Sequence, residues 1–164
     1  MSKAIKVKKG ANINLVGEAQ KAVSPAQRSS EFALKPDDFF GTIPKLSLKE
    51  GAEVKAGTSL FYDKAKTRVK FTSPVSGEIV EVKRGAKRKI LEVKVLADNE
   101  TKYESFTPWT GGSDREALVN TMLEMGLWPF LKQRPYGVVA NPDETPRDIF
   151  VSFNNTAPLA PDAS

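Results

Sequence analysis

Apolar and polar residues alternate along most of the first hundred positions of the chain. Between Ile5 and Tyr103 the apolar side chains recur at every second residue in several short runs. A period of two places alternate side chains on one face of a β-strand, so each run predicts a strand. Glycine, proline and serine turns separate the runs at short intervals, which is typical of a small β-sandwich or β-barrel. The runs include Leu46 with Leu48, Val69 with Phe71, Val80 with Val82, and Leu91 with Val93 and Val95.

The pattern changes after Pro108. Ser113 and Glu116 have the spacing of a capping box, in which the serine side chain accepts from the Glu116 amide and the glutamate accepts from the Ser113 amide. We therefore predict a helix over about residues 114–125, ended by Gly126.

A strongly apolar run follows at residues 148–153 and predicts a strand. Helix, loop and buried strand is the order found in α/β units, yet no second crossover helix follows. We expect a mainly β domain over residues 1–104, and the start of a truncated α/β unit over residues 105–164.

Turn residues specify the β-domain more closely. Sharp corners of a folded sheet need residues that tolerate positive φ or close backbone approach, and the small intervening residues fit a thin core. This spacing resembles the biotinyl/lipoyl-like barrel-sandwich hybrid, whose two halves carry such elements in pseudo-symmetric positions. The predicted corners are Gly51, Gly57, Pro74, Gly77 and Gly85.

Composition narrows the possible chemistry. The chain has 164 residues and contains no cysteine and no histidine, which excludes thiolate chemistry, disulfides and imidazole metal ligands and leaves carboxylates, lysines and hydroxyls. Its net charge of +5 is uneven, because residues 1–104 hold 21 basic and 13 acidic side chains, whereas residues 105–164 hold 4 and 7. With no apolar run long enough to span a bilayer, we expect a soluble, cytoplasmic chain.

Lys64 lies in an Asp63-Lys64-Ala65 tripeptide like the one in which lipoyl domains carry their modified lysine. A carrier lysine must occupy the apex of a tight hairpin, but the residues after Lys64 lengthen this tip. We therefore expect an unmodified, solvated lysine, with a lipoyl- or biotinyl-type carrier as the alternative.

A run of cations occupies one predicted hairpin tip. It could bind the phosphates of nucleic acid or anionic lipid, but no aromatic residue is present in it to stack on bases. We expect a solvated loop and no nucleic-acid partner, and keep an RNA-binding barrel as an alternative. The run comprises Lys83, Arg84, Lys87, Arg88 and Lys89.

Further motifs resemble one protein family, that of the A subunit of the sodium-translocating NADH:quinone oxidoreductase. They are Gly41-Thr-Ile-Pro-Lys-Leu46, Lys49-Glu-Gly-Ala-Glu-Val-Lys-Ala-Gly57, Phe71-Thr-Ser-Pro-Val-Ser-Gly77, Gly126-Leu-Trp128 and Asn155-Thr-Ala-Pro-Leu-Ala160. The resemblance implies the N-terminal part of a longer, membrane-peripheral protein at the cytoplasmic face of the inner membrane. Its partners would be the other subunits, and contact with the membrane would be indirect.

The resemblance also implies where cofactors bind. Related folds hold flavin mononucleotide and NADH on a glycine-rich loop after the helix, but here Trp128, Pro129 and Phe130 crowd that loop, so we expect no such cofactor in this chain. FAD, FMN, riboflavin, a 2Fe-2S centre and ubiquinone would lie in or near other subunits. We expect no catalytic or metal-binding residue, and a scaffold role for this chain.

Two sets of side chains have competing interpretations. Trp128, Phe130 and Tyr136 could line a quinone-access surface, or they could cover the sheet or face another subunit. Carboxylate pairs at Asp37-Asp38 and Asp143-Glu144 lie in polar turns and are interpreted as turn formers, not as acid/base couples.

Overall fold

The computed structural model describes Lys9, Val16 and residues 22–152. Arg28–Thr145 forms one compact unit, and the flanking segments are grouped in a second. Among the described residues, the flanking segments contain no helix or strand, and no helix anywhere is long and apolar enough to cross a membrane.

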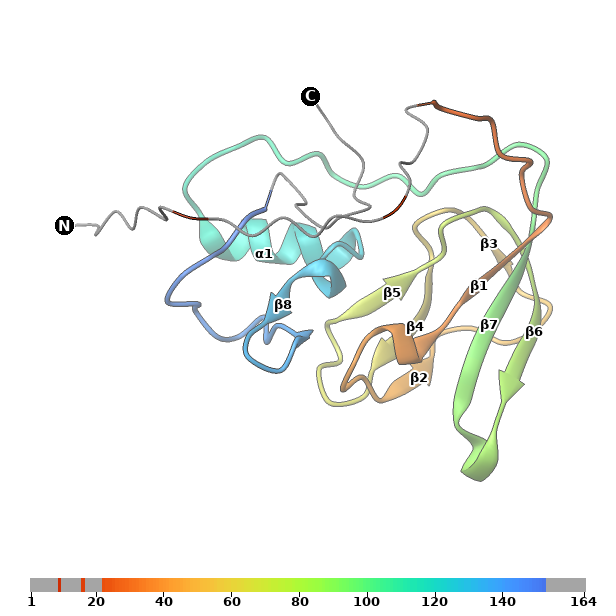
Figure 1. Cartoon of the computed structure of the whole chain (residues 1–164), viewed down its shortest axis with the longest axis horizontal. Coiled ribbons are helices and arrows are strands. Elements are labelled where there is room, and N and C mark those ends of the chain that lie inside the picture. The colour runs from red at the N-terminus through yellow and green to blue at the C-terminus, as the bar shows by residue number, and fades with distance from the viewer. Residues whose placement is uncertain (1–8, 10–15, 17–21, 153–164) are drawn as a thin grey trace. The chain divides into compact units, whose positions relative to one another are not determined.

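Two antiparallel sheets build the β-part of Arg28–Thr145 (Figure 1). The larger sheet has the strand order β1-β7-β6-β3, and the smaller sheet has the order β2-β4-β5. The strands are β1 (Glu31–Leu34), β2 (Pro44–Leu46), β3 (Glu53–Val54), β4 (Ser59–Asp63), β5 (Lys70–Thr72), β6 (Gly77–Arg84) and β7 (Ile90–Ala97). Short 3-10 turns are η1 (Pro36–Asp38) and η2 (Ala86–Arg88).

Cross-strand register places the alternating apolar residues between the two sheets. In the β6–β7 pair, Ile79 opposes Val95 and Val82 opposes Val93. All four are buried, but the predicted alternation of Val80 with Val82 is wrong: the register shifts between Ile79 and Glu81, so Ile79 is buried and Val80 is 40% exposed. The mainly β fold and the barrel-sandwich architecture predicted from the sequence are confirmed.

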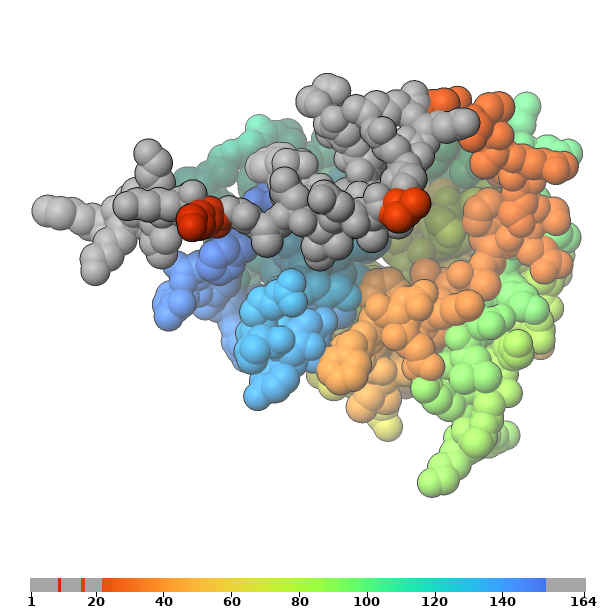
Figure 2. Space-filling view, viewed as in Figure 1, coloured from red at the N-terminus to blue at the C-terminus, as the bar shows by residue number. Residues whose placement is uncertain are grey.

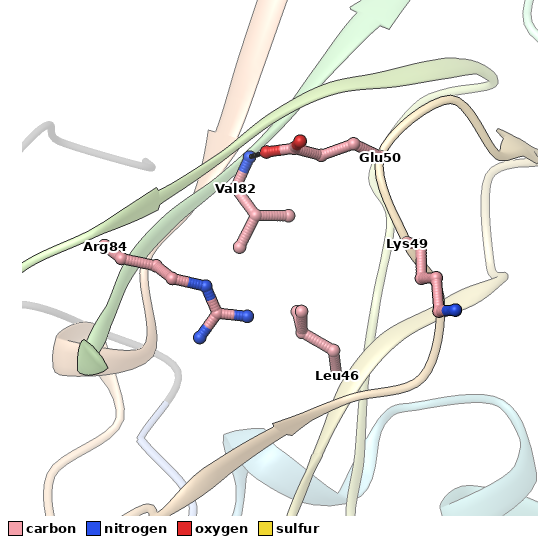
Figure 3. Close-up of a pocket in the computed structure, with 5 residues that line it drawn as sticks. All are labelled: Leu46, Lys49, Glu50, Val82 and Arg84. Atoms are coloured by element: carbon pink, nitrogen blue, oxygen red, sulfur yellow. Dashed lines mark hydrogen bonds between the residues drawn. The ribbon is translucent and has the colours of Figure 1, made fainter.

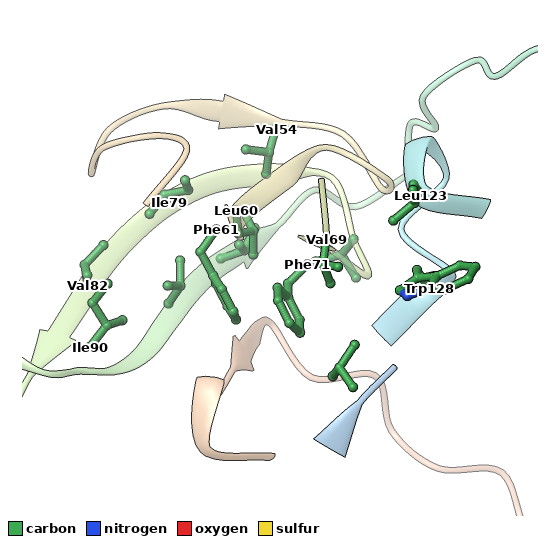
Figure 4. Packing of buried hydrophobic residues seen from close by; sticks show 14 of the residues in the cluster. Val54, Leu60, Phe61, Val69, Phe71, Ile79, Val82, Ile90, Leu123 and Trp128 are labelled. Atoms are coloured by element: carbon green, nitrogen blue, oxygen red, sulfur yellow. The ribbon is translucent and has the colours of Figure 1, made fainter. Parts of the chain in front are cut away.

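Stacked phenylalanines fill the centre of the core (Figure 4). The Phe61 and Phe71 rings lie 4.7 Å apart and nearly parallel, and Phe39 meets Phe71 edge-on at 4.6 Å. The same apolar cluster continues into Leu123 and Trp128, beyond the last barrel strand. The barrel and the segment after it therefore share one core.

The segment after the barrel begins with α1 (Arg115–Glu124), which falls within the predicted helix. The predicted capping box is wrong, because the N-cap is Asp114, whose side chain accepts from the amides of Glu116 and Ala117. A carboxylate satisfies these donors and also complements the positive end of the helix dipole better than the Ser113 hydroxyl. After α1 come η3 (Trp128–Phe130) and a small hairpin of β8 (Lys132–Gln133) and β9 (Val138–Val139).

The predicted strand at residues 148–153 is also wrong over its described part. Residues 148–152 have no strand geometry, and Ile149, Phe150 and Val151 are exposed; Phe153 lies outside the described residues. A strand forms only when its backbone groups pair with a neighbouring strand, and within the described residues none pairs with this run.

Candidate functional site

The glycine corners differ in what requires a glycine. At Gly77 φ is +151°, and an added Cβ would lie only 1.8 Å from the Leu96 carbonyl oxygen. Gly51 and Gly57 also have positive φ, whereas Gly85 has a φ of −101° and is instead approached by the Leu91 side chain. Pro74 is exposed in the Ser73–Val75 turn, where the buried Ser73 hydroxyl donates to the Val75 carbonyl.

Lys64 lies directly after β4 at the start of the β4–β5 loop, and its side chain is exposed. The buried Asp63 before it accepts from the amides of Ile43 and Ala65, so this carboxylate organises the backbone of the loop. Lys64 therefore follows a rigid point of the barrel.

The rest of the β4–β5 loop is fastened to the segment that follows the barrel. Lys66 Nζ donates to the Val139 carbonyl at 2.6 Å, and Arg68 forms an ion pair with Asp143 at 2.9 Å. Arg68 also donates to the Asn120 side-chain oxygen. We call Lys66, Arg68 and their acceptors the loop clasp. No local pattern in the sequence indicates it, because each cation lies more than fifty positions from its acceptors.

The crowded turn after α1 packs closely against the barrel. A Cβ at Gly126, where φ is +70°, would lie 2.4 Å from the Thr72 methyl group in β5. Trp128 and Pro129 are buried, and the Trp128 indole donates to the Ala140 carbonyl at 2.9 Å. The amides of Leu127, Phe130 and Leu131 in this turn already donate to the carbonyls of Met122, Leu127 and Trp128.

The three aromatic quinone candidates have different environments. Trp128 is only 6% exposed and belongs to the core cluster, whereas Phe130 and Tyr136 are 71% and 79% exposed. The structure therefore separates the tryptophan from the other two, which face solvent within the described part of the chain.

Cations at the β6–β7 hairpin tip are partly engaged. Lys89 forms an ion pair with Asp37 at 2.7 Å, and Lys83 lies 3.8 Å from Glu92. Arg84 donates to the Arg88 carbonyl. One carboxylate of each turn-forming pair thus enters an ion pair with a cation: Asp37 here and Asp143 in the loop clasp.

A second ion pair crosses the β6–β7 ladder. Glu81 accepts from the Lys94 ammonium group, and this hydrogen bond, with the charge behind it, lowers the pKa of Glu81. The same bond raises the pKa of Lys94. Both groups lie at the solvent-facing surface, so the pair stabilises the ladder only modestly.

An open pocket of about 350 Å³ lies between the two sheets beside the hairpin. Figure 3 shows Leu46 facing Val82 and the Arg84 guanidinium across the space, with Lys49 at the rim. Glu50 closes one side, where its Oε1 accepts from the Val82 amide at 2.6 Å. The pocket combines an apolar floor with a cationic rim. Sequence reasoning missed it, because its walls come from residues more than thirty positions apart.

Comparison with known proteins gives two family matches. The family model described as "NqrA N-terminal barrel-sandwich hybrid domain" matches residues 5–98, and that described as "NqrA second alpha/beta domain" matches residues 113–164. Proteins named as the A subunit of Na(+)-translocating NADH-quinone reductase are similar over most of this chain. The one from Vibrio vulnificus strain YJ016 is 36% identical over 159 residues, that from Neisseria meningitidis serogroup B 35% over 161, and that from Alcanivorax borkumensis 32% over 162. These alignments cover 95–96% of this chain but only 36% of each relative.

Proposed function

Because the chain belongs to the NqrA family, we propose that it acts as part of a subunit of a sodium-translocating NADH-quinone reductase, as a scaffold without catalytic groups of its own. The curated relatives carry that name, and the chain spans about a third of their length. Electron transfer from NADH to quinone and sodium export would be activities of the whole complex.

The shared core is the observation that carries the scaffold role. Barrel residues Phe61 and Phe71 and the following residues Leu123 and Trp128 belong to one apolar cluster. Packing of this kind holds elements in a fixed geometry, since interiors are dense and resist deformation. A rigid body of this kind suits a part whose task is to hold neighbouring subunits in place.

Several polar side chains of this chain make structural contacts, which supports the same role. Asp63 holds loop amides, Ser76 donates to Asp98 and accepts from the Lys102 amide, and the Trp128 indole is bonded to a carbonyl. The absence of cysteine leaves this sequence without thiolates for a 2Fe-2S centre. We place FAD, FMN, riboflavin, the iron-sulfur centre and ubiquinone in or near other subunits, and the chain at the cytoplasmic face of the membrane.

Co-purification tests the scaffold role. The full subunit, tagged and expressed from its own locus, should bring down multi-spanning partner subunits from detergent-solubilised membranes, together with sodium-stimulated quinone reduction by NADH. A loop-clasp variant, Lys66→Met with Arg68→Gln, should reduce the yield of the assembled complex without changing the turnover of the complex that remains. A tagged subunit that is recovered alone, or a clasp variant that lowers turnover per complex, would contradict the proposal.

Quinone access is a second candidate, favoured by the exposure of Phe130 and Tyr136. Flat apolar ligands bind well on aromatic side chains, and among the described residues neither ring has a structural partner comparable with that of Trp128. Photolabelling of the assembled complex with an azidoquinone should modify residues 127–136 if this surface contacts quinone. Adducts confined to other subunits would remove the candidate.

A further inference from the structure

The tip of the β6–β7 hairpin projects beyond the neighbouring strands (Figure 2). Its seven residues from Lys83 to Lys89 include five cations, and three of these have partners described above. Within the described part of the chain, Lys87 and Arg88 have no side-chain partner, and both are exposed. Two positive charges therefore remain available at the end of the projection.

Lys87 and Arg88 also occupy unusual backbone conformations. Their φ angles are +54° and +62°, and they are the only described residues other than glycine with positive φ. Left-handed geometry disfavours long side chains, and glycine or asparagine normally occupies such positions. Strained residues of this kind concentrate where the side chain has a functional role. Local conformational preference would not place a lysine and an arginine at these two positions.

The pocket beside the hairpin shares a residue with this tip. Arg84 contributes its guanidinium to the pocket rim, opposite Leu46 and next to Val82 (Figure 3). Glu50, the acidic residue of the lining, is engaged by the Val82 amide. A ligand would thus meet an apolar floor, the Arg84 guanidinium, and further cations along the hairpin.

We propose that this surface docks an acidic protein segment that carries one apolar anchor residue. The anchor would occupy the pocket over Leu46 and Val82, while flanking carboxylates would pair with Arg84, Lys87 and Arg88. Charge complementarity favours an acidic ligand, since the barrel region carries a large excess of basic side chains.

The composition of the tip argues against other polyanions. Residues 83–89 contain no aromatic side chain on which bases could stack, and their only apolar residue is Ala86, which cannot anchor the tip in lipid. Two free cations alone give weak attraction to a bilayer. The proposal concerns the surface alone and does not depend on the scaffold role in the reductase.

Fluorescence anisotropy tests the proposal on the purified chain. The probe is a fluorescein-labelled peptide, Gly-Asp-Glu-Leu-Glu-Asp-Gly, titrated at low salt. The double variant Lys87→Asn with Arg88→Asn removes both charges but retains a residue type that accepts left-handed geometry, so its thermal stability should equal or exceed that of the parent. We expect binding to weaken about fivefold to tenfold, the effect of losing two exposed charge pairs. The matched control, Lys64→Asn with Lys70→Asn, removes two exposed lysines at the β4–β5 connection, away from the hairpin, and should bind like the parent.

Changes to the peptide test the contributions of the apolar pocket and of the hairpin cations separately. Replacing its leucine with glycine should weaken binding if the pocket is used, and replacing its acidic residues with asparagine and glutamine should abolish binding. Equal loss in the two double variants, or no effect of the leucine, would overturn the proposal. Tighter binding to phosphatidylserine vesicles or to an oligouridine, lost in the hairpin variant, would also overturn it and assign the surface to phosphate groups. Failure of the peptide to bind would likewise overturn it, while leaving the co-purification test of the scaffold role unaffected.

Discussion

Substitution of Gly77 by alanine tests the steric basis of the folded sheet. Gly77 begins β6, where it pairs with Val54 of β3 and Ala97 of β7. A Cβ there would lie 1.8 Å from the Leu96 carbonyl oxygen, although real Cβ atoms essentially never approach closer than 3.0 Å. The backbones of β6 and β7 would therefore have to separate by more than an ångström.

The expected cost has two parts. Holding alanine in a backbone region used almost only by glycine costs about 1–3 kcal/mol. Separation of the strands would also weaken neighbouring hydrogen bonds such as that from the Asp98 amide to the Ser76 carbonyl, each with a net contribution of about 1 kcal/mol. We expect Gly77→Ala to lower the free energy of unfolding by about 3–5 kcal/mol, which would unfold a large share of a marginally stable chain.

Gly51→Ala provides the matched control. Gly51 also has a positive φ, +82°, but an added Cβ would meet no atom within 4 Å. Its cost is the conformational part alone, about 1–2 kcal/mol. Urea unfolding of both variants, followed by far-ultraviolet circular dichroism and tryptophan fluorescence, measures the difference. A difference below about 1 kcal/mol would refute the view that close backbone approach, and not φ alone, requires glycine at the β6 corner.

Three further predictions concern charged side chains. Arg68→Ala should lower stability by only about 1 kcal/mol, because its ion pair with Asp143 is exposed, and should speed hydrogen exchange at the Asp143 amide; unchanged exchange would argue against the clasp. Lys64 should remain unmodified when the chain is expressed with lipoyl and biotinyl ligases, so an intact mass with either adduct would restore the carrier alternative. The lowered pKa of Glu81 means that its pairing with Lys94 stabilises the fold above pH 4.5 and that this contribution is lost as the pH falls through the folded-state pKa. Stability curves of Glu81→Gln and the parent should therefore differ at neutral pH and converge in acid; a constant difference would contradict this pairing.

Local patterns were enough to predict the barrel. Alternation of apolar residues correctly indicated that β6 and β7 are strands, because one face of each is buried and the other is solvated. It assigned Val80 to the buried face of β6 wrongly, because the register shift after Ile79 leaves no mark in a period of two. The corner at Gly77 was predicted from its local turn residues, although the approach of the Leu96 carbonyl that requires glycine there is a contact between distant residues. At Gly85 the local pattern predicted the turn but not its conformation, since this glycine begins the hairpin turn without positive φ.

Contacts between distant segments could not be predicted in this way. The bond from Lys66 to Val139 and the bond from the Val82 amide to Glu50 join residues far apart in sequence. No sequence motif around any of these four residues indicates that the bonds form. The helix cap shifted from Ser113 to Asp114 because adjacent residues can both cap and the better acceptor prevails. The apolar run at residues 148–153 looked like a strand because periodicity reports composition, whereas pairing depends on an available edge.

The loop clasp bears on where this polypeptide can be divided. A cleavage after Glu104, at the apparent end of the barrel, would leave Lys66 and Arg68 without their acceptors and would strip Leu123 and Trp128 from one flank of the apolar cluster. The released piece would retain its strands but would expose an apolar surface to water, and such a surface promotes self-association. The smallest self-sufficient piece therefore extends past Asp143, and expression trials that stop earlier should yield insoluble material.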